Sequence, residues 1–219
     1  MRTVVIGDIH GCYDELYNLI TGLQEDGKYN IETDRLIFLG DYIDRGNQSS
    51  KVIKYIRHLQ SKSDNVIALM GNHEDMMVTH FELNGYDNGA WAMNGGNETK
   101  WSYASEEELM SDVEWAKKLP LYYEDEHFIY VHAGVNVNKD MNEQSRNDLL
   151  WIREGFIYNN NPYYKRVVFG HTPLCHKNPY YTPTNNICID TACVFNGCLT
   201  ALILDDGEIE DYYQVEKIN

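Results

Sequence analysis

Gly40-Asp41-Tyr42-Ile43-Asp44-Arg45-Gly46 places three charged side chains between two glycines. It follows the apolar run 35–40, whose length and composition predict a buried strand. Two carboxylates and a guanidinium therefore follow a strand end, between glycines that permit tight turns and close backbone approach. Ligands of open α/β sheets bind beyond the carboxyl ends of strands, so we expect these side chains to face a ligand.

Four other predicted strands end in the same way. Their ends are Gly7-Asp8-Ile9-His10-Gly11, Gly71-Asn72-His73-Glu74, His132-Ala133-Gly134 and Gly170-His171-Thr172. One histidine at a strand end is more often structural than a ligand, but turn chemistry does not explain five such ends in one chain. Carboxylate, imidazole and amide ligands suit borderline or hard divalent ions such as Mn, Fe or Zn. A carboxylate shared by two ions would make a dinuclear site, which activates water and holds a phosphoryl group.

The wider pattern predicts an α/β sandwich. Besides 35–40, the runs that read as strands are 3–7, 65–71, 127–131, 166–170, 187–189 and 199–204. Apolar residues at helical spacing lie between the early strands, at 16–23 and 52–59, and a capping box opens a third helix at Ser105. Three glycine- or proline-rich segments read as long loops, at 84–102, 155–165 and 173–186. The tyrosines of the last two either cover the edge of the core or form a lip for substrate.

Composition limits the possible partners. The chain of 219 residues is 43% hydrophobic, which is typical of a globular protein. Its 18 basic and 34 acidic residues give a net charge of −16, which argues against nucleic-acid and anionic-membrane binding. The apolar runs are too short to span a bilayer, and a strand pattern begins at once at the N-terminus, so we expect a cytoplasmic protein. The five cysteines lack CxxC spacing and predict neither a disulfide framework nor a thiolate zinc site.

Taken in order, these motifs resemble the phosphoprotein phosphatase family of metallophosphoesterases, and most of all its compact bacterial and phage members, the lambda protein phosphatase group. The motifs that carry the resemblance are GDIHGCYDEL at 7–16, GDYIDRG at 40–46, GNHEDMM at 71–77, HAG at 132–134, WIRE at 151–154, GHTP at 170–173 and IDT at 189–191. The resemblance implies one calcineurin-like metallophosphoesterase domain over 1–219. Its fold would be a β-sandwich flanked by helices (αββα).

The resemblance also implies two divalent metal ions, with Mn²⁺ favoured over Fe or Zn. Asp8, His10 and Asp41 would hold the first ion. Asp41 would bridge to the second ion, whose other ligands would be Asn72, His132 and His171.

Four more residues receive roles from the resemblance. His73 would be the general acid, and Asp44 would orient it and favour its charged form. Arg45 and Arg153 would grip phosphate oxygens, for which a planar guanidinium is well suited. We expect Trp151, two residues before Arg153, to be a packing anchor. Ala192 departs from the family pattern, which often has glycine after Asp-Thr.

The function implied is a serine/threonine protein phosphatase, with phosphotyrosine as a further candidate, acting through direct attack by a metal-bridging hydroxide. The substrate would be a phosphorylated protein or a small phosphoester. No regulatory subunit is implied, because the extensions of the eukaryotic relatives are missing. The alternative is a symmetrical diadenosine tetraphosphate hydrolase, which shares two motifs but is usually longer. A catalytically dead metal-binding scaffold is a third reading, but it would need neither His73 nor the arginines.

Overall fold

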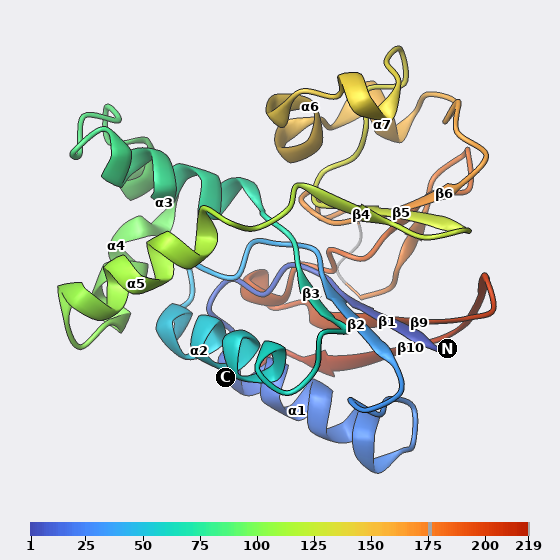
Figure 1. The fold of residues 1–219 in the computed structure, drawn as a ribbon, viewed down its shortest axis with the longest axis horizontal. Helices are drawn as coiled ribbons and strands as arrows, with labels where there is room; N and C mark the ends of the chain where they lie inside the picture. The colour runs from blue at the N-terminus through green and yellow to red at the C-terminus, as the bar shows by residue number, and fades with distance from the viewer. Residues whose placement is uncertain (175–176, 219) are drawn as a thin grey trace.

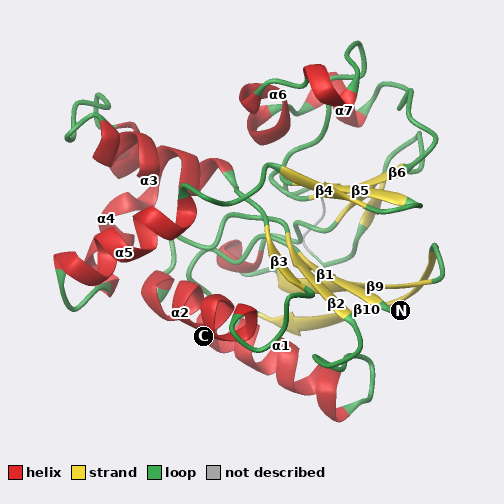
Figure 2. Ribbon diagram, in the orientation of Figure 1, coloured by secondary structure: helices red, strands yellow, loops and turns green. Residues whose placement is uncertain are grey.

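Two five-stranded mixed sheets face each other and carry helices on their outer sides in a computed structural model of the chain (Figure 1). The structure describes residues 1–174 and 177–218. Helices and strands separate into layers in Figure 2, with the strands in the middle. This arrangement confirms the predicted α/β sandwich.

The first sheet has the order β10-β9-β1-β2-β3. Its strands are β1 (Thr3–Ile6), β2 (Arg35–Phe38), β3 (Val66–Ala68), β9 (Cys198–Asp205) and β10 (Glu208–Glu216). β1, β2 and β3 are parallel, whereas β9 runs antiparallel to β1 and to β10. The carboxyl ends of the three parallel strands therefore meet at one edge of the sheet.

The second sheet has the order β4-β5-β6-β8-β7. Its strands are β4 (Tyr122–Glu124), β5 (Phe128–Val131), β6 (Arg166–Phe169), β7 (Tyr180–Tyr181) and β8 (Ile187–Cys188). β5, β6 and β8 are parallel, and β4 and β7 are antiparallel edge strands. This sheet thus also gathers three carboxyl ends at one edge.

Alternating side chains along each strand build the layers, because successive residues point to opposite faces of a sheet. In β1, Val4 and Ile6 pack toward the helices, while Val5 packs between the sheets. In β5, Phe128 joins the cluster between the sheets and Ile129 packs on the outer side. Apolar runs with no polar alternation are therefore needed, since both faces of each sheet are covered.

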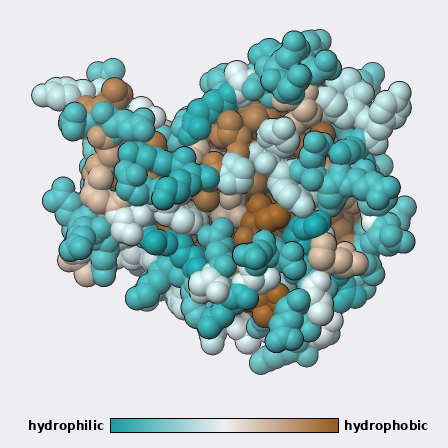
Figure 3. Space-filling model, viewed as in Figure 1, coloured by the Kyte–Doolittle hydropathy of each residue, from teal (hydrophilic) through white to brown (hydrophobic). Residues whose placement is uncertain are grey.

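The helices extend from the sheets on both sides. They are α1 (Tyr13–Glu25), α2 (Ser49–Gln60), α3 (Asn72–Glu82), α4 (Asn97–Ser102), α5 (Glu106–Ala116), α6 (Arg146–Trp151) and α7 (Glu154–Ile157), with short turns η1 (Ala92–Gly96), η2 (Met141–Glu143) and η3 (Cys193–Phe195). α1 and α2 pack on the first sheet, and α6 and α7 cover the second (Figure 1). On the face drawn in Figure 3 most residues are hydrophilic, in keeping with the acidic composition, and apolar ones gather toward the middle.

All seven predicted strands are present, but two expectations differ from the structure. The segment 84–102 is not a long loop: η1 and α4 occupy its second half, where only Gly95, at φ 102°, leaves the helical conformation. Strands β4, β7 and β10 escaped prediction because they are edge strands of partly exposed residues without a continuous buried apolar run, and much of β10 faces solvent.

Two other expectations concerned disulfide bonds and membrane-spanning segments. Cys12, Cys188, Cys193 and Cys198 are buried free thiols, and Cys175 lies outside the described residues. Within residues 1–174 and 177–218, none of the helices combines the length and the apolar character that a bilayer crossing requires.

Candidate active site

The ends of five strands bring the predicted ligands together. β1, β2 and β3 are followed by Asp8, Asp41 and Asn72, and β5 and β6 by His132 and His171. The two sheets therefore contribute to one buried cluster, whose members are all less than 6% exposed.

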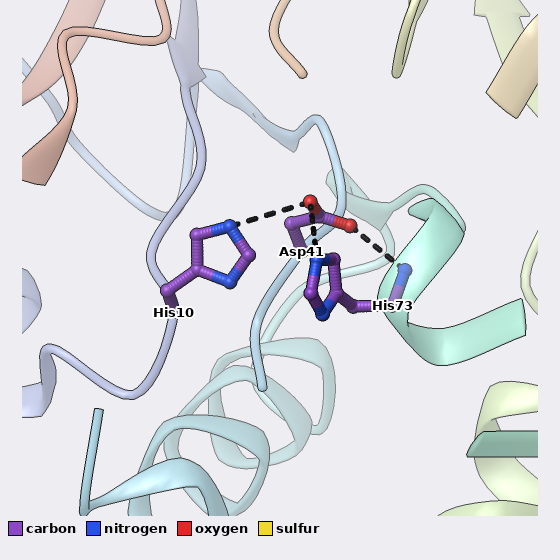
Figure 4. A group of neighbouring side chains, drawn as sticks. All are labelled: His10, Asp41 and His73. Carbon is purple, nitrogen blue, oxygen red and sulfur yellow. Dashed lines mark hydrogen bonds and ion pairs between the residues drawn. The ribbon is translucent and has the colours of Figure 1, made fainter. Parts of the chain in front are cut away.

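Asp41 lies at the centre of this cluster. Its Oδ2 is 3.4 Å from His10 Nε2 and 3.9 Å from His73 Nε2, as drawn in Figure 4. Its Oδ1 is 3.4 Å from His132 Nε2 and accepts a hydrogen bond from the His73 backbone N–H at 3.1 Å. Asp41 belongs to two groups of three potential ligands, one with His10 and His73 and one with His132 and His171. The carboxylate is thus placed as a shared ligand would be.

The second group closes around an amide oxygen. Asn72 Oδ1 is 2.8 Å from both His132 Nε2 and His171 Nδ1, and these two nitrogens are 3.2 Å apart. The Nδ1 atom of His132 faces the Leu39 carbonyl at 3.0 Å and donates to it, so its Nε2 presents a lone pair to the cluster.

The donor set of the cluster fits divalent metal ions. His10 repeats the arrangement of His132: Nδ1 donates to the Ile43 carbonyl at 2.8 Å, which leaves Nε2 as an acceptor beside Asp41. The lone pairs of His10 and Asp41 therefore meet in one group and those of His132, Asn72 and Asp41 in the other, and a cation satisfies each such set of acceptors. The His171 Nε2 atom is buried without a hydrogen-bond partner.

The pKa shifts of the clustered residues favour the protonation states that metal binding requires, an ionised Asp41 and neutral imidazole ligands. Burial opposes ionisation of Asp41, but the surrounding imidazoles, among which His73 has a raised pKa, hold the pKa of Asp41 well below the usual range. Burial lowers the pKa of His10 and of His132 and so favours the neutral ring, which is the form that ligates a metal. Asp8 accepts from the His171 backbone N–H at 3.0 Å, and burial, with Asp190 and Asp41 nearby, raises its pKa. Asp8 lies outside the two close groups of three, so its place as a ligand stays a prediction.

His73 and Asp44 form a buried pair. His73 Nδ1 donates to Asp44 Oδ2 at 2.6 Å, and Asp44 also accepts from Trp91 Nε1 at 3.0 Å and from Thr99 Oγ1 at 2.6 Å. Burial opposes the charged ring, but Asp41 and the Asp44 hydrogen bond outweigh it and raise the pKa of His73. Trp91 and Thr99 were not identified from the sequence, because they lie in the segment expected to be a loop.

Two arginines face a cavity of about 190 Å³ beside the cluster. Arg45 Nη1 donates to His10 Nε2 at 2.5 Å, and Arg153 Nη1 donates to Thr172 Oγ1 at 3.2 Å. Asp190, which we had not singled out although IDT was a motif, also lines the cavity, and burial raises its pKa to about 6. A larger cavity, about 480 Å³, lies over α2 and α5 beside Lys54, away from the ligand cluster, so volume alone does not locate the chemistry.

Trp151 is not the packing anchor that we expected. Its side chain is 39% exposed, and its ring centroid lies 6.0 Å from that of His171. It occupies the last position of α6, where the chain turns toward Arg153. Among the described residues that line the cavity beside the ligand cluster there is no tyrosine of the predicted loops, and Tyr180 and Tyr181 form edge strand β7.

Left-handed backbone conformations are concentrated at the site. Non-glycine residues with φ between 46° and 72° include His10, Asp41, Asp44, Arg45, His171 and Ala192. Such conformations cost free energy for L-residues and are held in place by the surrounding structure. The backbone at Ala192 is left-handed, with φ 60° and ψ 41°. Glycine adopts this conformation more easily than alanine, which accounts for the glycine that the family pattern often has at this position.

Glu74 holds the loop that carries Asp41, Tyr42 and Ile43 in place. We had not singled out this residue from the sequence, although GNHE was a motif. Its Oε2 accepts from the backbone N–H groups of Asp41 at 2.8 Å and Gly71 at 3.0 Å. Its Oε1 accepts from those of Tyr42 at 2.8 Å and Ile43 at 3.4 Å. Burial and Asp41 raise the pKa of Glu74 to about 8, yet both oxygens face N–H donors, an arrangement that suits the carboxylate and not the acid.

Comparison with known proteins agrees with this geometry. The model of the calcineurin-like phosphoesterases matches residues 1–202. The chain belongs to the calcineurin-like phosphoesterase family. This family relationship implies divalent metal ions and makes the chain a phosphoester hydrolase, as the resemblance of its motifs had indicated.

Two kinds of dinucleoside tetraphosphatase are similar in sequence to this chain. A protein named bis(5'-nucleosyl)-tetraphosphatase PrpE, asymmetrical, from Halalkalibacterium halodurans is 30% identical, with 92% of this chain and 89% of that protein covered. A symmetrical bis(5'-nucleosyl)-tetraphosphatase from Erwinia tasmaniensis is 31% identical over 64% of this chain, and the chain spans about half of that protein, 47%. A solved structure provisionally assigned as a diadenosine tetraphosphatase superposes with a TM-score of 0.73 at 20% identity, covering 100% of this chain and 94% of that one.

These comparisons correct the main functional expectation. The prediction of a serine/threonine protein phosphatase acting on phosphorylated proteins is wrong, because the similar proteins are named as dinucleoside tetraphosphatases. The alternative considered from the sequence shares motifs with the protein phosphatases, so these motifs alone did not decide between the two substrates.

Proposed function

We propose that this protein hydrolyses dinucleoside tetraphosphates with two divalent metal ions. Among divalent ions, Mn²⁺ suits the mixed carboxylate and imidazole ligands best. The observation that carries the proposal is the end-to-end match to the asymmetrical PrpE protein. The symmetrical relative matches over about half of its length, so we propose the asymmetrical mode of cleavage in place of the symmetrical one considered from the sequence.

The metal ligands of the proposal are Asp8, His10, Asp41, Asn72, His132 and His171. Support comes from the two groups of potential ligands that share Asp41. The ions, when bound, would activate water and offset the negative charge of the phosphate chain. The protein itself fixes the imidazole lone pairs toward the cluster through carbonyl acceptors at Ile43 and Leu39.

His73 is the proposed general acid, and Asp44 positions it. Its Nδ1–H is held by Asp44 at 2.6 Å, which directs Nε2 toward the site. From there His73 can give a proton to the oxygen that leaves with the departing nucleotide. Arg45 and Arg153 bind oxygens of the phosphate chain, and both line the cavity beside the ligand cluster.

The test is to incubate the purified protein and Mn²⁺ with diadenosine tetraphosphate and to separate the products chromatographically. Asymmetrical cleavage gives equal amounts of AMP and ATP, whereas symmetrical cleavage gives only ADP. A phosphothreonine peptide and p-nitrophenyl phosphate serve as comparison substrates. A kcat/KM for the peptide above that for the dinucleotide would contradict the proposal.

We also propose that 1–219 forms one catalytic domain and that it works in the cytoplasm. The cluster of buried residues between the two sheets supports the first proposal. The free, buried state of the four described cysteines supports the second.

A further inference from the structure

An exposed aromatic ring stands at the edge of the phosphate-binding cavity. Phe195, at the end of η3, is 52% exposed. The cavity that it lines also has the apolar residues Pro173 and Val194 and the polar or charged residues Asp8, His10 and Arg45 in its wall. The lining therefore offers groups for a charged phosphate as well as groups for an apolar ring.

Arg45 contacts both the aromatic ring and a polar residue of this cavity. Its guanidinium carbon lies 5.3 Å from the centroid of the Phe195 ring, while Nη1 reaches His10. The arginine thus stacks on one side of the ring. Since the ring is still half exposed, it retains surface for a second planar group.

We infer that Phe195 is a stacking platform for a nucleobase of the substrate. The inference rests on the proposed function, because a nucleotide carries its base one sugar away from the phosphate that Arg45 would grip. Aromatic side chains stack on any base, so the platform selects for nucleotides over plain phosphates without selecting one base. A nucleotide presents a base to such a ring, whereas a plain phosphate presents none, so the platform would give the site a preference for nucleotides.

The experiment compares two competitive inhibitors of p-nitrophenyl phosphate hydrolysis in excess Mn²⁺. ATP carries a base, and inorganic tripolyphosphate offers a phosphate chain alone. In the variant Phe195→Leu the inhibition constant of ATP should rise about 5- to 150-fold, which is the usual stacking free energy of ~1–3 kcal/mol at 1.4 kcal/mol per tenfold. The constant of tripolyphosphate should stay within twofold, and Phe195→Trp should restore ATP binding.

The control is Tyr164→Leu, which removes another exposed ring, one that does not line the cavity. It should change neither constant. Equal increases for ATP and tripolyphosphate in Phe195→Leu would overturn the inference and make Phe195 a support for Arg45. No change for either inhibitor would also overturn it.

The two proposals fail separately. Inhibition by ATP does not require hydrolysis of a dinucleotide, so the platform stands if diadenosine tetraphosphate is not cleaved but ATP loses affinity in the variant. Conversely, if the dinucleotide is cleaved with the same KM by the variant and the wild-type protein, the proposed function stands and the platform falls.

Discussion

Replacing Glu74 by glutamine should destabilise the protein and weaken metal binding together. The carboxylate accepts four backbone N–H groups, two on each oxygen, from the loop that carries Asp41 and from Gly71. Glutamine keeps one acceptor oxygen and puts an NH₂ group in place of the other. Two buried N–H donors would then face a donor and lose their partners.

The magnitude follows from those two donors. An unsatisfied buried polar group costs about 1–3 kcal/mol, so the free energy of unfolding should fall by about 2–6 kcal/mol. Asp41 is held at a φ of 53° by this loop, and a looser loop should also bind metal less tightly. Urea unfolding of the metal-free protein measures the first effect, and elemental analysis after gel filtration measures the second.

The exposed residue Glu126 provides the control. Glu126→Gln should change stability by no more than about 0.5 kcal/mol, as surface substitutions usually do. If Glu74→Gln loses less than about 1 kcal/mol and retains two metal ions, then the hydrogen bonds of Glu74 do not hold the loop and our reasoning is refuted.

Three further predictions concern the metal, the acid and the backbone. Chelation should abolish hydrolysis, and Mn²⁺ should restore it at least as well as Mg²⁺, since imidazole ligands prefer the softer ion; full turnover in excess EDTA would contradict this. His73→Asn should leave the metal content unchanged and lower kcat about 10²–10⁴-fold on an alkyl phosphate, but less on p-nitrophenyl phosphate, whose leaving group needs no proton. Equal losses on both, with chemistry rate-limiting, would argue against an acid role. Ala192→Gly should raise the free energy of unfolding by roughly 0.5–1 kcal/mol, because relief of ~1–2 kcal/mol of left-handed strain exceeds the added chain entropy; a lower urea midpoint would show that the strain is not relieved.

The strands and the ligand cluster could be predicted from the sequence because they depend on local patterns. An apolar run such as 35–40 marks a strand covered on both faces, and the polar residue after it marks the functional edge. Edge strand β10 carries no such mark, because only its pairing with β9 makes it a strand.

Contacts between distant segments were not predictable in the same way. Trp91 and Thr99 reach Asp44 only because the glycine-rich segment folds into η1 and α4. The choice between substrates failed for a related reason. The motifs contain the residues that we propose to hold metal and phosphate, whereas Phe195 lies outside them and is brought beside Arg45 and the cavity only by the fold.

The left-handed residues around the site have a consequence for attempts to make the protein heat-resistant. Glycine relieves the backbone at left-handed positions such as His10, Asp41 and His171, so a design rule that replaces left-handed residues by glycine would select them. Those changes would delete the side chains that we propose as metal ligands. Libraries screened for heat tolerance should therefore hold these positions fixed, with Ala192 as the exception, because its methyl group belongs to none of the groups proposed to act on substrate.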